Sequence, residues 1–159
     1  MTCDCTFIFT FFISLSTIGD ITPSSLNCPE VNCVVTIQSS QGKYIETSDE
    51  EAVIATSENV NENAMWYIFF LGDKVINLKN KASKNYLTAW PGGFMKHNVQ
   101  QPNEWERFTL KSIRDDTYSL MDHIGNYLSH ISSGDLRVRE SFVGSQETFK
   151  IDVGKRLKF

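Results

Sequence analysis

The chain has 159 residues, of which 41% are hydrophobic and 21% are charged, and its formal net charge is −4 at pH 7. A chain of this length forms one domain of ordinary size, with enough buried surface for a core that needs no metal or disulfide. The composition argues against a disordered chain and a polytopic membrane protein. The acidic balance argues against nucleic acid as a partner, because a phosphate backbone would be repelled.

The chain opens with an apolar run of thirteen residues, from Thr6 to Ile18. This run is shorter than the 20 or so residues that a membrane-spanning helix needs, so no transmembrane span is expected, and the run fits the core of a signal peptide. Small residues before Asp20 predict cleavage there, which makes 1–19 a signal peptide and 20–32 an N-terminal segment. Asp4 and the lack of a basic leader are atypical of a signal, so an uncleaved anchor and an extra packed strand stay as alternatives.

Four cysteines occur, and signal cleavage would remove Cys3 and Cys5. The remaining pair, Cys28 and Cys33, predicts a small disulfide loop in an oxidising compartment, provided that the turn between them brings their Cα atoms within about 7 Å. The alternative is that Cys33 is simply a buried strand residue. The sequence has no Asn-x-Ser/Thr glycosylation site, so secretion gains no support from that feature.

A threefold internal repeat is the strongest pattern in the sequence. Tyr44, Tyr86 and Tyr127 are separated by 42 and then 41 residues, and each is followed by Ile or Leu. Large aromatic residues stand twenty-two positions after these tyrosines: Trp66, Phe108 and Phe149. Apolar residues stand nine positions after them: Val53, Met95 and Leu136. Several offsets that recur in step are typical of a repeat architecture.

Each repeat contains the signals of four short strands with period-two alternation. The first strands carry pairs of apolar residues: Val35 and Ile37, Ile76 and Leu78, Tyr118 and Leu120. The second strands begin at the three tyrosines. The fourth strands are expected over 66–70, 105–110 and 147–151, and turns over 39–43, 91–93, 123–126 and 132–135.

Twelve strands in three equal units predict an all-β protein, a β-trefoil with pseudo-threefold symmetry over 33–153, followed by a basic tail at 154–159. One unit alone cannot bury its apolar face, whereas closing three units into a six-stranded barrel capped by three hairpins removes the exposed strand edges. A β-sandwich has no reason for threefold register, and a propeller needs at least four blades.

The motifs GKYI (42–45), KNYLTA (84–89) and GNYLS (125–129), each followed by an aromatic fourth strand, resemble the fascin-like β-trefoil group. The resemblance extends from Cys33 to Val153 and bears on the fold more than on activity, because a Gly-x-Tyr-Leu hairpin mainly serves folding. Fascins carry several tandem trefoils and cross-link actin inside the cell, so the resemblance implies actin as a partner if this chain is cytoplasmic. Ricin-type lectins share the fold, but their Gln-x-Trp motif does not occur in the fourth strands here.

No nucleophile-elbow, zinc-protease or phosphate-loop motif occurs in the sequence, so we expect no enzyme, no cofactor and no metal site. The three histidines, His97, His123 and His130, are expected at the surface or in capping positions, although His123 and His130 flank one turn and could face each other across it. The acidic run Asp49 to Glu51 lacks the spaced oxygen ligands of a calcium loop and predicts a solvated turn.

Two neighbouring features of the second repeat predict a ligand site. Three lysines crowd a hairpin that is one residue longer than its two counterparts, and Trp90 heads the turn WPGGF, where Pro and Gly leave little bulk to cover its indole. An exposed Trp is a stacking platform for a sugar or an aromatic group, although packing over the barrel mouth is an alternative for Trp90. The candidate ligand-binding residues are Lys79, Lys81, Lys84, Trp90, His97 and Asn98.

The leading hypothesis is a secreted or lumenal, non-catalytic module that binds carbohydrate or a protein surface through its loops. The first alternative is a cytoplasmic fascin-like actin-binding protein, in which case the N-terminal run is not a signal. The second is a trefoil protease inhibitor, for which the polar loop from Ser57 to Ala64 is the longest candidate.

Overall fold

The computed structural model describes Leu26, 33–72 and 74–154. The strands of these residues are β1 (Cys33–Ser39), β2 (Tyr44–Thr47), β3 (Val53–Ser57), β4 (Met65–Gly72), β5 (Val75–Asn80), β6 (Tyr86–Trp90), β7 (Phe94–Val99), β8 (Phe108–Arg114), β9 (Thr117–Met121), β10 (Tyr127–His130), β11 (Leu136–Glu140) and β12 (Phe149–Val153). Three short 3-10 helices, η1 (Glu62–Ala64), η2 (Glu104–Glu106) and η3 (Ser132–Gly134), precede β4, β8 and β11. The predicted signal peptide, the segment 20–25 and 27–32, and the tail from 155 lie outside the described residues.

Six strands close a barrel. β1 pairs with β4 and β12, β5 pairs with β4 and β8, and β9 pairs with β8 and β12, all antiparallel. Because every barrel strand has a partner on both sides, the barrel leaves no open edge.

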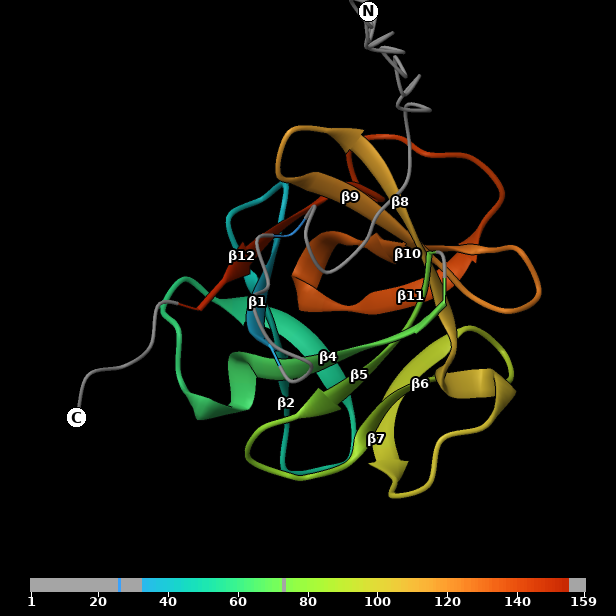
Figure 1. The fold of residues 1–159 in the computed structure, drawn as a ribbon. Helices are drawn as coiled ribbons and strands as arrows, with labels where there is room; N and C mark the ends of the chain where they lie inside the picture. Colours follow the sequence, from blue (N-terminus) through green and yellow to red (C-terminus); the bar gives the residue numbers. More distant parts are fainter. Residues whose placement is uncertain (1–25, 27–32, 73, 155–159) are drawn as a thin grey trace, which may run out of the picture.

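The hairpins β2–β3, β6–β7 and β10–β11 cap the barrel and meet one another around the pseudo-threefold axis. Their mutual bridges are Ala52 with Lys96, Phe94 with Arg137, and Ile54 with Asp135. Figure 1 shows the three hairpins following one another round the molecule. The predicted all-β fold, a β-trefoil of three four-stranded repeats, is confirmed.

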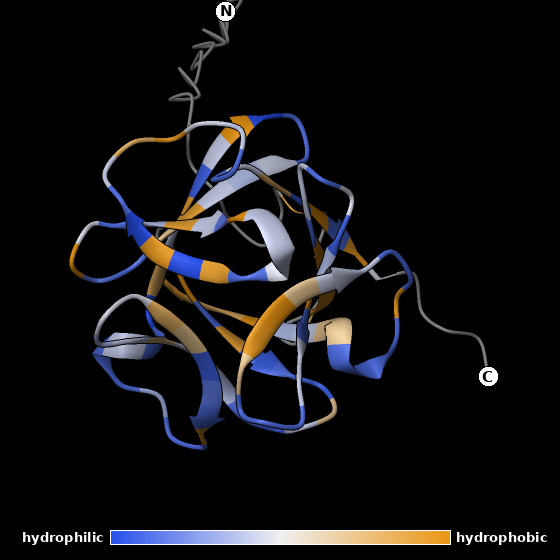
Figure 2. Ribbon diagram, turned by 180° about the vertical axis from the view of Figure 1, so that it is seen from behind, coloured by the Kyte–Doolittle hydropathy of each residue, from blue (hydrophilic) through white to orange (hydrophobic). Residues whose placement is uncertain are grey.

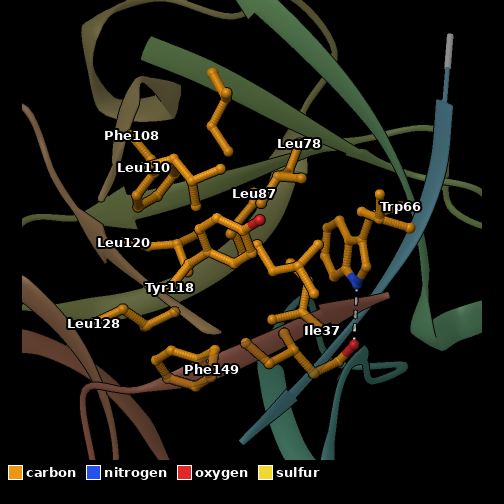
Figure 3. Close-up of a cluster of buried hydrophobic side chains, with 14 of the residues drawn as sticks. Ile37, Trp66, Leu78, Leu87, Phe108, Leu110, Tyr118, Leu120, Leu128 and Phe149 are labelled. Atoms are coloured by element: carbon orange, nitrogen blue, oxygen red, sulfur yellow. Dashed lines mark hydrogen bonds between the residues drawn. The ribbon is translucent and has the colours of Figure 1, made fainter. Parts of the chain in front are cut away.

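Most of the core consists of the apolar positions that repeat in the sequence. Trp66, Phe108 and Phe149 are fully buried, as are the aliphatic residues that follow the three tyrosines (Figure 3). In several strands, buried apolar residues alternate with outward polar ones (Figure 2), as in β11, where Leu136 and Val138 are buried and Arg137 and Arg139 point outward. The period-two alternation therefore assigned the inner face correctly.

The last residue of each first strand, or the residue directly after it, caps the turn that follows. The amide of Ser39 bonds to the carbonyl of Lys43, and that of Asp122 to Asn126, across four positions in each case. In the second repeat the equivalent bond runs from Asn80 to the carbonyl of Asn85, at 2.8 Å and across five positions. This extra residue accounts for the longer spacing between the first two tyrosines.

Two predicted fourth strands begin later than expected. Residues 104–106 form η2 instead of strand, because the side chain of Asn103 accepts a bond from the amide of Trp105 and the carboxylate of Glu106 accepts one from the amide of Asn103. This capping box turns the backbone just before Phe108. β12 likewise starts at Phe149, because the carboxylate of Glu147 accepts a hydrogen bond of 2.8 Å from the amide of Gly144 and so belongs to the preceding turn.

Candidate functional site

Trp90 lies at the tip of the β6–β7 hairpin, directly opposite Phe94. The two residues are 42% and 48% exposed. The amide of Gly93 donates to the carbonyl of Trp90 at 3.0 Å and closes the tight turn between them. The hairpin therefore presents two large aromatic side chains to solvent, in contrast to the alternative in which Trp90 packs over the barrel mouth.

A positively charged side chain lies over each of these rings. The Nζ atom of Lys96 lies 4.9 Å from the centre of the Trp90 ring, and the guanidinium carbon of Arg137 lies 3.9 Å from the centre of the Phe94 ring. Arg137 belongs to the next repeat, where its nearest carboxylate oxygen is that of Asp135 at 3.8 Å. We call Trp90, Phe94, Lys96 and Arg137 the Trp90 cluster. It combines apolar ring surface with positively charged hydrogen-bond donors.

The backbone geometry of Gly93 positions the cluster. This glycine has a φ of 82°, and a Cβ atom there would stand 2.6 Å from the carbonyl oxygen of Val138. The amide of Val138 in turn donates to the carbonyl of Gly93 at 2.8 Å. The close approach of these two backbones brings Arg137 over the ring of Phe94, so the absence of a side chain at Gly93 is a condition for the cluster.

Only the second repeat carries the aromatic pair. The positions equivalent to Trp90 and Phe94 are Ser48 and Ala52 in the first repeat, and Ile131 and Asp135 in the third. This asymmetry makes the β6–β7 hairpin different from its two counterparts. Because all three repeats have the same fold, exposed side chains found in only one of them are not required for folding.

The three predicted lysines do not join Trp90. Lys79 and Lys84 lie over tyrosine rings, and Lys81 forms an ion pair with Glu62 at 3.5 Å. Lys79 is opposite Tyr86, the first residue of β6, and Lys84 precedes Tyr86 by two positions, whereas Trp90 is the last residue of the strand. At about 3.4 Å per residue, the strand separates the two places by roughly 14 Å. The predicted site therefore divides into two surfaces.

His97 and Asn98 belong to neither surface. The ring nitrogen Nε2 of His97 lies 2.9 Å from the carbonyl oxygen of Ser48, and the side-chain amide of Asn98 donates to the carboxylate of Glu51 at 3.1 Å. His97 is also buried. Both residues thus connect the β2–β3 turn to β7. Asp49, Glu50 and Glu51 are exposed, as expected of a solvated turn, and Glu51 also takes part in these contacts.

The remaining polar candidates also have structural partners. His123 stacks edge-on against Trp105 with ring centres 4.3 Å apart, whereas His130 is buried, so the two histidines do not face each other. In the loop from Ser57 to Ala64, the side chain of Asn61 caps η1, which the sequence did not predict. Within the described residues, no group of three or more His, Cys, Asp or Glu side chains could hold a metal ion. Cys33 is disulfide-bonded, and its predicted partner Cys28 lies outside the described residues.

A pocket of about 350 Å³ lies beside the β8–β9 turn. The Nζ atom of Lys150 lies 3.4 Å from a carboxylate oxygen of Asp116 and 3.3 Å from one of Asp152. These ion pairs occupy two of the carboxylates that line the pocket. Its lining residues are Leu26, Asp115, Asp116, Tyr118, Ile151, Asp152 and Val153.

Acidification is expected to destabilise the fold through His130. Its pKa is lowered, first because burial removes the ring from water and further because of the positive charge of Lys43, while a hydrogen bond with the backbone of Ala55 acts in the opposite direction. Because the folded pKa lies below the unfolded value of 6.5, protons bind the unfolded chain more readily. The free energy of unfolding is therefore expected to be highest above this value and to fall as the pH decreases below it.

Thermal melting at about pH 7.5 and about pH 5 measures this effect. The control is His130→Thr, because Thr47 occupies the equivalent position of the first repeat. We expect the melting temperature to drop less with acidification in the variant than in the parent protein. Equal drops in both proteins would assign the acid sensitivity to other groups.

Comparison with known proteins identifies the architecture. No protein-family model and no curated protein matches the chain. Among solved structures, a designed threefold-symmetric protein, ThreeFoil, aligns with a TM-score of 0.68 and 18% identity over 77% of this chain and 99% of its own. A lectin of Polyporus squamosus, solved with a human-type influenza-binding epitope, aligns with a TM-score of 0.68 and 13% identity over 78% of this chain. The match spans half of that lectin, and at these identities both likenesses establish the fold alone.

The described residues contain no helix that is long and apolar enough to cross a membrane.

Proposed function

We propose that the protein is a secreted, non-catalytic recognition module that binds carbohydrate through the Trp90 cluster. The observation that carries this proposal is the exposed pair of Trp90 and Phe94 on a single hairpin, flanked by Lys96 and Arg137. A sugar ring has an apolar C–H face and a rim of hydroxyl groups. An aromatic platform bordered by hydrogen-bond donors complements both parts.

The cluster is also largely preorganised for binding. Arg137 stacks on Phe94 and Lys96 on Trp90, so these long side chains already occupy defined positions before a ligand arrives. Side chains that are ordered in advance lose less conformational entropy on binding, which favours affinity. The ammonium group of Lys96 forms no ion pair within the described part of the chain, so it is available to ligand oxygens.

Secretion is supported by the disulfide of Cys33, because disulfides persist in oxidising compartments. The test is the intact mass of the protein that a eukaryotic cell exports. This mass should equal that of the chain without 1–19, less two hydrogens for one disulfide. Retention of Met1 on a cytosolic protein would instead favour the fascin-like alternative. Cosedimentation with actin filaments then becomes the measurement of choice.

Replacing Trp90 with alanine should weaken glycan binding by about 1 kcal/mol or more, which is the usual effect of an important interface aromatic. The melting temperature should barely change, because Trp90 is 42% exposed and lies at a hairpin tip. Binding to the best ligand from a glycan array, measured by titration calorimetry, gives the first quantity. Thermal melting gives the second.

The matched control is Phe142→Ala, which removes an aromatic side chain that is 65% exposed in the loop before β12. It should leave the affinity of the same glycan unchanged. If Trp90→Ala binds as tightly as the parent protein, or loses affinity only in step with its folded fraction, the Trp90 cluster is not the carbohydrate site.

A further inference from the structure

A second aromatic and cationic surface lies on the outer side of the barrel, where β4, β5 and β6 run side by side. Tyr67 of β4 is opposite Lys79 of β5, and Lys79 is opposite Tyr86 of β6. The ring of Phe69 lies 6.2 Å from that of Tyr86 with a tilt of 47°. With Lys84 from the β5–β6 turn, these five residues form what we call the lysine–tyrosine face.

The two lysines of this face are held over aromatic rings. The Nζ atom of Lys79 is 5.2 Å from the centre of the Tyr86 ring, and that of Lys84 is 5.9 Å from the centre of the Tyr67 ring. Neither lysine forms an ion pair among the described residues. A cation over a ring is positioned but not neutralised. The face therefore carries two ordered, uncompensated positive charges on a protein whose net charge is −4.

The lengthened β5–β6 turn places Lys84. The side-chain oxygen of Asn80 accepts bonds from the amides of Ala82 and Ser83, both at 3.0 Å, which fixes the start of the turn. Lys84 then adopts a φ of 62°, a conformation uncommon for residues other than glycine, and its ammonium group donates to the carbonyl of Lys81. Residues in uncommon backbone conformations often cluster at functional sites, and Lys84 is such a residue in a turn that is longer than its two counterparts.

We propose that the lysine–tyrosine face is a second, separate binding site, for an acidic polysaccharide whose carboxylates are spaced by neutral sugars. The ammonium groups of Lys79 and Lys84 would bind carboxylates, while the rings of Tyr67, Phe69 and Tyr86 would contact sugar faces and their hydroxyl groups. Widely spaced charges suit a protein that is acidic overall, because a dense polyanion would be repelled by the rest of its surface. An acidic peptide lacks the flat apolar faces that three rings can cover.

The test uses hyaluronan oligosaccharides, which carry one carboxylate in every second sugar, with neutral dextran and polyglutamate as comparison ligands. The full secreted protein should bind hyaluronan at low ionic strength, more weakly as salt rises, and should bind dextran and polyglutamate much less. The double variant Lys79→Gln with Lys84→Gln should lose about tenfold in affinity. Arginine at both positions should restore most of it, because the charge and the ring contact are kept.

A charge-matched control is Lys111→Gln with Lys150→Gln, which removes two positive charges elsewhere and should bind hyaluronan as the parent protein does. Trp90→Ala should also bind it normally, so failure of this site and failure of the Trp90 cluster are distinguishable. Absence of hyaluronan binding by the folded parent protein would overturn the proposal. So would equal binding of polyglutamate, or an equal loss of affinity in the charge-matched control.

Discussion

Replacing Trp66 with alanine is expected to lower the free energy of unfolding by about 3–5 kcal/mol, as large-to-small changes of buried aromatic residues do. Trp66 has no exposed surface, and it fills the barrel beside Ile37 (Figure 3). Its indole Nε1 also donates to the carbonyl of Ile45 at 3.0 Å. The substitution therefore creates a cavity and leaves a buried carbonyl without its partner. Denaturant unfolding followed by circular dichroism measures the change.

The internal symmetry supplies the control. Phenylalanine occupies the equivalent positions, Phe108 and Phe149, so Trp66→Phe keeps an aromatic filler and removes only the indole hydrogen bond and some volume. We expect this variant to lose about 1–3 kcal/mol, and so to unfold between the parent protein and Trp66→Ala. If alanine and phenylalanine cost the same, the hydrogen bond to Ile45 rather than ring packing dominates at this position.

The fold was predictable from the sequence because three copies of one pattern had to satisfy the same physics. Each tyrosine offset that repeats corresponds to a side chain on the inner face, from Ile45 to Phe149, so a single consistent alternation assigned most of the core. Leu26, which precedes the first repeat, is also part of the core and was not predicted. The later starts of β8 and β12 were missed because polar side chains, and not apolar ones, set where these strands begin. The carboxylates of Glu106 and Glu147 cap backbone amides while buried, and a hydrophobic pattern does not report such bonds.

The candidate site was predictable only in part. The exposure of Trp90 followed from the small residues after it, but its grouping with the three lysines failed because a strand separates residues that are close in sequence. His97 and Asn98 do not join Trp90 for a related reason, since they lie further along β7 and contact the first repeat.

Phe94, Lys96 and Arg137 were missed altogether. Phe94 and Lys96 are two and four residues from Gly92 on the strand that returns from the turn, so applying the hairpin register to the sequence would have found them. The position of Arg137 depends on how two hairpins meet across the pseudo-threefold axis, which the spacing within one repeat does not contain.

Replacing Gly93 with alanine is expected to lower the free energy of unfolding by about 2–5 kcal/mol, from two costs that add. The φ of 82° is unfavourable for any residue with a Cβ atom. That atom would also stand 2.6 Å from the carbonyl oxygen of Val138, so β11 must move away and the bond from the amide of Val138 to the carbonyl of Gly93 lengthens. Because this contact carries Arg137 over Phe94, glycan binding by the Trp90 cluster should fall more than the folded fraction does.

Gly125→Ala separates the two costs of Gly93→Ala. Gly125 has a similar φ of 98°, in the β9–β10 turn, but a Cβ atom there would meet nothing within 4 Å. This variant should therefore show only the backbone cost, about 1–2 kcal/mol, and should bind glycan as the parent protein does. Denaturant unfolding of both variants, with glycan affinity measured under native conditions, gives the difference. If the two alanines cost the same and bind alike, the approach of Gly93 to Val138 does not hold the hairpins together, and the Trp90 cluster does not depend on it.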